Sequence, residues 1–134
     1  MALAHDTLER QHRKVMKDLA RIEGLPRARR HRLRIRLKRL RYACQSLASL
    51  HDRDAVAAYV EAIARLQDDL GGMADAMAGR RLVASLTLSR GRRAAALEAL
   101  NRIERESLAP LSPHVAAFAA AHPFWRAEVR RSRG

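Results

Sequence analysis

The sequence has little of several residue types that would place it in other classes of protein. Its 134 residues include one cysteine, Cys44, which excludes an internal disulfide and suits a reducing cytoplasm. The longest apolar run, VAAFAAA at 115–121, is far too short to cross a bilayer, and residues 1–10 lack the apolar segment of a signal peptide. We therefore expect a cytoplasmic protein with no membrane contact.

Aromatic and β-branched residues are also scarce. The chain has five aromatic residues, whereas alanine, leucine and arginine dominate it, and this composition is typical of helices. No strand pattern or repeat is present. The predicted fold class is all-α: a four-to-five-helix bundle with short loops over residues 1–122, followed by a basic C-terminal tail at 123–134.

Apolar spacing and punctuation predict the helix boundaries. Gly24 ends the first helix, and Gly71-Gly72 is interpreted as a second helix stop. Gly91 separates the last two long helices, and Ser112-Pro113 begins a short one. The predicted helices cover about residues 5–23, 26–50, 52–70 and 73–89, then a fifth helix after Gly91.

Positive charge is concentrated near the N-terminus. Residues 1–50 carry 14 lysines and arginines against 4 acidic residues, whereas residues 51–89 carry 4 against 6. The formal net charge of the whole chain is +13. Positive charge that served only solubility would be spread more evenly along the chain, so this distribution indicates a surface that binds a polyanion.

The stretch HRLRIRLKRLRY at 31–42 shows how that surface is built. At about 100° per residue, its leucines and Cys44 fall on one side of a helix, and a row of cations falls within about 80° on another side. The preceding helix repeats the cation spacing, so an antiparallel pair of these helices is expected to flank one groove with two basic rows. The predicted binding residues are Arg10, Lys14, Lys17, Arg21, Arg27, His31, Arg34, Lys38 and Arg41.

Other interpretations of the charge stay open. Arginines also coat solvated helices and cover apolar surface with their stems. A nucleic-acid-binding protein would equally carry +13, although five aromatic residues leave little for base stacking and no groove-reading motif is present. A basic module for an acidic partner protein or a granule surface is the remaining alternative.

Three motifs resemble a known family, the CHAD domain, or conserved histidine α-helical domain. HRLRIRLKRLRY is similar to its H-x-x-R-x-x-x-K-x-x-R-Y signature, through His31, Arg34, Lys38, Arg41 and Tyr42. A second segment resembles L-Q-x-x-L-G-x-x-x-D, and the closing HPFW resembles the aromatic end of the domain. The residues of the second motif are Leu66, Gln67, Leu70, Gly71 and Asp75.

The resemblance implies a helical fold of two related halves that binds inorganic polyphosphate through basic and histidine residues. The resemblance is to the C-terminal half of the domain. A whole domain of the family is about twice as long as this chain, so the chain is expected to correspond to one half. Gln45 and Ala74 depart from residues that are frequent in the family. A homodimer that supplies two copies of the basic rows would restore a complete domain, and association with polyphosphate granules is a further expectation.

No catalytic or metal-binding motif emerges. The histidines form no H-x-x-x-H pair, and the glycines form no phosphate loop. Asp68, Asp69 and Asp75 are predicted to serve helix ends and inter-helix pairs, because three acids without a nucleophile make no catalytic constellation. His12 is predicted to be a core histidine, Tyr42 and Tyr59 are expected to pack, and His31 is expected to be a pH-dependent donor. We expect no enzyme, no cofactor and no metal.

Overall fold

The computed structural model describes residues 2–126 and contains helices joined by short turns, which confirms the predicted all-α class. None of the helices within these residues is long and apolar enough to cross a bilayer. Their order is α1 (Ala2–Leu19), η1 (Ile22–Gly24), α2 (Arg27–Ser46), η2 (Ala48–Leu50), α3 (Arg53–Ser85), α4 (Arg90–Leu108) and α5 (Leu111–Ala120).

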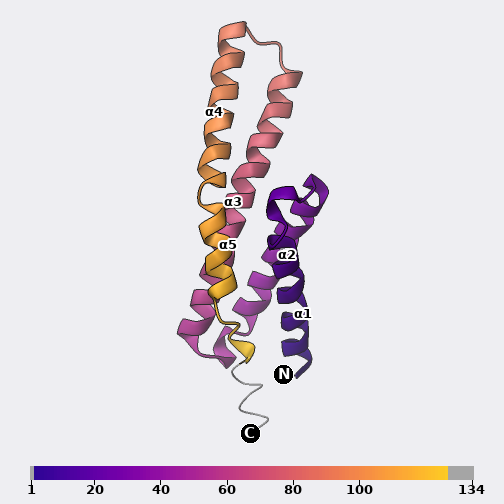
Figure 1. Cartoon of the computed structure of the whole chain (residues 1–134), viewed down its shortest axis with the longest axis vertical. Helices are drawn as coiled ribbons and strands as arrows, with labels where there is room; N and C mark the ends of the chain where they lie inside the picture. The colour runs from indigo at the N-terminus through magenta and orange to yellow at the C-terminus, as the bar shows by residue number, and fades with distance from the viewer. Residues whose placement is uncertain (1, 127–134) are drawn as a thin grey trace.

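The helices form a bundle from which one hairpin projects (Figure 1). Helices α1 and α2 form an antiparallel pair that packs against the first half of α3, and α5 covers the same half. The second half of α3 and most of α4 continue beyond the turn between α1 and α2. Consequently α4 has no buried residue, and Leu97, Ile103 and Leu108 remain 37–44% exposed.

The core lies where α1, α2, α3 and α5 meet. Helix α2 contributes the stripe that its spacing predicts, Leu33, Leu37, Leu40 and Cys44, and each is at most 1% exposed. Burial raises the pKa of the Cys44 thiol to about 12, so this cysteine behaves as an apolar core residue.

The aromatic end of the described chain joins this core. Phe124 and Trp125 are 4% and 1% exposed, and Trp125 packs edge-on against the ring of Tyr59. The start of the predicted tail at 123–134 is therefore part of the bundle. Residues 127–134 of that tail lie outside the described residues.

The predicted helix stop at Gly71-Gly72 is wrong, because α3 runs through both glycines to Ser85. A glycine in a helix interior costs roughly 1 kcal/mol relative to alanine, yet here the small residue permits close packing of α3 against α4. A Cβ at Gly72 would overlap Ser107 Oγ, and one at Gly79 would overlap Leu100 Cδ2.

The break between α3 and α4 also differs from the prediction. It lies at 86–89, and Gly91 falls inside the first turn of α4. Ser89 caps this helix by accepting a hydrogen bond from the backbone N–H of Arg92 at 3.3 Å. Asp52 caps α3 in the same manner, by accepting a hydrogen bond from the backbone N–H of Ala55 at 3.0 Å.

Candidate functional site

The cations of α2 stand on the two flanks and the outer side of a helix whose fourth side is buried. Because its leucine stripe faces the core, the residues between those leucines must point toward α1, toward α3 or into solvent. Helix α1 packs beside one flank and α3 beside the other. The cations of α2 are consequently divided between two grooves.

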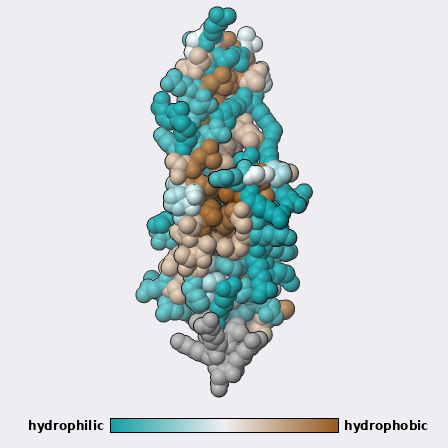
Figure 2. Space-filling view, in the orientation of Figure 1, coloured by the Kyte–Doolittle hydropathy of each residue, from teal (hydrophilic) through white to brown (hydrophobic). Residues whose placement is uncertain are grey.

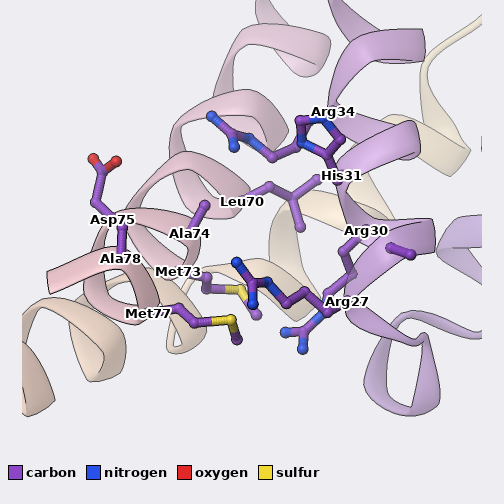
Figure 3. Close-up of a pocket in the computed structure, with 11 residues that line it drawn as sticks. Arg27, Arg30, His31, Arg34, Leu70, Met73, Ala74, Asp75, Met77 and Ala78 are labelled. Carbon is purple, nitrogen blue, oxygen red and sulfur yellow. The ribbon is translucent and has the colours of Figure 1, made fainter. Parts of the chain in front are cut away.

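The α2–α3 groove has a cavity volume of about 650 Å³. Its α2 wall carries Arg27, Arg30, His31 and Arg34. Its α3 wall is mostly apolar, and Figure 3 shows methionine side chains extending from α3 toward the arginines while the carboxylate of Asp75 points away from them. The α3 residues that line the groove are Leu70, Met73, Ala74, Asp75, Met77 and Ala78.

The side chain of Arg34 packs against Gly71 in this groove. Its guanidinium lies 3.9 Å from the place where a Cβ of Gly71 would stand, which is an ordinary van der Waals distance. Arg34 is half-buried there, whereas Arg27 and His31 are exposed. The glycine of the second motif thus adjoins the arginine of the first, and two segments far apart in sequence meet at one place.

The α1–α2 groove lies on the other flank of α2. Lys14 and Lys17 of α1 line it, together with a second row of arginines from α2. Asp18 forms an ion pair with Arg36 at 3.2 Å and is the carboxylate that lines this surface. The arginines of the second row are Arg29, Arg32, Arg36 and Arg39, and they were not among the predicted binding residues.

The expectation that the two predicted rows flank one groove is wrong. Lys14 and Lys17 face the second row of α2, whereas Arg27, His31 and Arg34 line the groove on the α3 side. Arg21 lies apart from both, in a crevice between the turn after α1 and the junction of α4 and α5. Figure 2 shows hydrophobic side chains gathered near the middle of the molecule, bordered by hydrophilic ones.

The remaining predicted residues lie outside the lining of these grooves. Arg10 is exposed on α1. Lys38 and Arg41 follow Arg34 along α2 and approach the ring of Tyr42, with charge-to-centroid distances of 6.0 and 5.5 Å. Tyr42 is 51% exposed, so its expected packing role is limited to these cation contacts.

The second arginine row had a signal in the sequence. Its members are spaced by 3, 4 and 3 residues, as a helical face requires, and it flanks the same leucine stripe. The family signature includes only the row that contains His31, so only that row of α2 was predicted to bind. Which row faces α1 depends on helix packing, and that packing is not visible in the local pattern.

Within the part of the chain that the structure describes, the predicted cations have no carboxylate partners. Within residues 2–126, none of the nine predicted binding residues forms an ion pair. The acidic residues that do form ion pairs have other partners, for example Glu9 with Arg126 and Arg13, and Glu104 with Arg80. On α2, the Nε atoms of Arg30 and Arg41 are buried and have no hydrogen-bond partner among the described residues.

The prediction for His12 is confirmed. The ring is 6% exposed, and its Nδ1 lies 2.8 Å from the hydroxyl of Tyr59. Burial lowers the pKa of His12 and raises the pKa of Tyr59, so the hydrogen bond joins a neutral imidazole to a protonated phenol. This pair belongs to the core and takes no part in the grooves.

The acidic residues of α3 serve the fold where the structure assigns them contacts. Asp69 is 6% exposed and lies 2.5 Å from Nδ1 of His114 on α5, which is an inter-helix pair of the kind predicted. Asp68 and Asp75 are exposed. Within residues 2–126, histidine, cysteine, aspartate and glutamate form no cluster of three that suits a metal ion.

Comparison with known proteins gives one match. A protein-family model described as the CHAD domain matches residues 1–84, which contain α1, α2 and most of α3. Both grooves lie entirely within the matched segment. The crevice at Arg21 is bordered in part by Leu108 to Val115, which lie outside that segment. No curated protein and no solved structure matches the chain.

Proposed function

This chain belongs to the CHAD domain family, and we propose that it binds inorganic polyphosphate through the exposed cations of α1 and α2. The observation that carries the proposal is that none of the nine binding residues predicted from the sequence forms an ion pair within residues 2–126. Like charges three or four residues apart on a helix repel one another by a few tenths of a kcal/mol per pair. A bound polyanion would remove that repulsion.

The chemistry of the ligand suits such a surface. Polyphosphate is a flexible chain with about one negative charge per phosphate and no bases to distinguish. Rows of arginine and lysine suffice to hold it, because each contact releases a condensed counterion and adds a charge-assisted hydrogen bond. The proposed binding residues are those predicted from the sequence, joined by the second arginine row of α2, Arg29, Arg32, Arg36 and Arg39.

The division of cations between two grooves shapes the proposal. A polymer that follows one groove meets only one set of cations, whereas a long flexible polymer can cross the exposed side of α2 and engage both sets. Exposed His31 and Lys38 lie on that crossing. We therefore propose that long polymers bind more tightly than short ones at equal phosphate concentration.

The proposal includes the biological setting. We propose that the chain is a binding module without catalysis, that it acts in the cytoplasm at polyphosphate granules, and that a second copy pairs with it to complete a two-half domain. The acidic-partner and nucleic-acid alternatives are the competing functions. The scarcity of exposed aromatic side chains favours polyphosphate over nucleic acid, because bases need such side chains for stacking. Four of the five aromatic residues are buried in the core: Tyr59, Phe118, Phe124 and Trp125.

Competition binding tests this function. The full chain is titrated with long-chain polyphosphate, single-stranded DNA, double-stranded DNA and RNA, at matched phosphate concentration and about 0.1 M salt. We expect polyphosphate to bind most tightly, with an affinity that falls steeply as salt rises. Tighter binding of duplex DNA would assign the protein to the nucleic-acid class instead, and no binding of any of these polymers would favour an acidic protein partner.

A further inference from the structure

The α2–α3 groove contains more apolar surface than a phosphate chain can use. Its α2 wall presents Arg27, Arg30, His31 and Arg34, but the facing wall consists mostly of methyl, methylene and thioether groups, apart from Asp75. An inorganic phosphate polymer has no apolar part to place against them. The apolar wall therefore indicates a ligand with both a phosphate end and an organic end.

We propose that this groove binds a nucleoside polyphosphate, with its phosphates on the α2 cations and its base against Met73 and Met77. This inference rests on the proposed function, since the phosphates use the same cations, and it adds a subsite for an organic group. Methionine suits a flat ring because its thioether is flexible and polarisable, and contacts of sulfur with aromatic rings are favourable.

The size of the groove suits such a ligand. Its cavity volume of about 650 Å³ lies in the range of small-molecule sites, roughly 300–1,000 Å³. The apolar wall extends from Leu70 to Ala78, which is about 12 Å along the helix. That length accommodates a base and its sugar but is short for a long acyl chain.

The charges around the groove agree with this orientation. The carboxylate of Asp75 is the acidic group in the lining, and it points away from the arginines (Figure 3). Both methionine side chains extend toward the arginine side, so a base held by Met73 and Met77 would leave its phosphates within reach of the α2 wall. Arginine forks bind phosphate oxygens in pairs, which fixes the orientation of the phosphate end.

A matched pair of small ligands tests the organic subsite. Adenosine triphosphate and inorganic triphosphate carry the same number of phosphates, and they are titrated calorimetrically against the full chain without divalent cations. We expect the nucleotide to bind about tenfold more tightly, since contacts between methionine and an aromatic ring reach that size.

The double variant Met73→Gln with Met77→Gln isolates the apolar wall. Glutamine has a similar length and helix propensity, and both methionines are half-buried, so we expect the fold to persist, as circular dichroism would check. Nucleotide affinity should fall to that of inorganic triphosphate, while the affinities of inorganic triphosphate and long-chain polyphosphate stay unchanged. Leu97→Gln, which changes an exposed apolar residue of α4, is the matched control and should alter none of the three.

The other outcomes separate this inference from the proposed function. Equal affinities for the two triphosphates, with long-chain polyphosphate still bound, would overturn the nucleotide subsite and leave the polyphosphate proposal standing. Failure of every phosphate ligand would overturn both. Tighter binding of an alkyl phosphate than of the nucleotide would assign the wall to an aliphatic group. A dimer that the double methionine variant dissociates, with unchanged nucleotide affinity, would assign the wall to a second copy.

Discussion

The double variant Arg34→Gln with Lys38→Gln should weaken polyphosphate binding by a calculable factor. Both residues belong to the family signature, neither forms an ion pair within residues 2–126, and Lys38 is exposed. Their loss should change the free energy of unfolding by no more than about 0.5 kcal/mol, as is usual for surface changes. An effect on binding would therefore report the contact with the polymer.

The magnitude follows from counterion release. For a flexible single-stranded polyanion, each phosphate contact contributes roughly 0.7 to the slope of log K against log salt. The α2 row predicted from the sequence contains four permanently charged residues, Arg27, Arg34, Lys38 and Arg41. Contacts of a polymer with these four residues should contribute about −2.8 to the slope. Removing two of the four should make the slope shallower by about 1.4 and lower the affinity by about 25-fold at 0.1 M salt.

The assay is a titration of long-chain polyphosphate at five salt concentrations between about 0.05 and 0.3 M, with helicity followed by circular dichroism. The matched control is Arg102→Gln with Arg105→Gln, which removes the same charge from exposed positions on α4. It should leave the slope within error of the parent. An unchanged slope in the Arg34 and Lys38 variant, with intact helicity, would refute the assignment of the α2 row to the polymer.

A second pair of substitutions reports on the other groove. Lys14→Gln with Lys17→Gln removes two cations that face the second arginine row. If a long polymer crosses α2, this variant should lower the salt slope for long chains by about 1.4 but leave binding of inorganic triphosphate at the α2–α3 groove unchanged. Equal loss for both ligands would contradict two separate grooves.

The core makes three further predictions. Tyr59→Phe should cost about 1–3 kcal/mol in urea unfolding, because the buried His12 loses its hydrogen-bond partner. Burial lowers the pKa of His12 below 6.5, so the unfolded chain takes up a proton that the native chain excludes. Stability should therefore decrease as the pH falls below about 6.5, and this decrease should be smaller in His12→Gln. Cys44, with a pKa of about 12, should resist thiol reagents at about pH 8 until the chain is unfolded. Gly79→Val should destabilise by about 1–3 kcal/mol through its clash with Leu100, and a gain in melting temperature would show that α4 can move aside.

Much of the fold was visible in local patterns. A helix must turn its apolar stripe inward, so the spacing of Leu33, Leu37 and Leu40 predicted both the helix and its buried side, and the structure agrees. His12 on the apolar side of its helix was predicted to be buried for the same reason. The positions of the basic rows could be predicted in the same way, because residues outside a buried apolar stripe lie on the remaining sides of the helix.

The glycines illustrate where local patterns fail. Gly71-Gly72 has the composition of a helix stop, and the cost of glycine in a helix supports that interpretation. Contact between α3 and α4 outweighs this cost, because Ser107 and Leu100 occupy the space that side chains at Gly72 and Gly79 would need. A residue separation of about 20 to 35 along the chain connects these partners, so no short window contains the reason.

The sequence alone determined the helical class, the inward side of the helix that carries the leucine stripe, the excess of cations over acidic residues near the N-terminus and the family signature, because each depends on residues close together in the chain. Only the tertiary structure decided which flank of α2 faces α1 and which faces α3, and hence that the cations line two grooves and that methionines of α3 form the second wall of one of them. Periodicity fixes a direction around one helix axis, but the neighbour found in that direction is chosen by packing between distant segments.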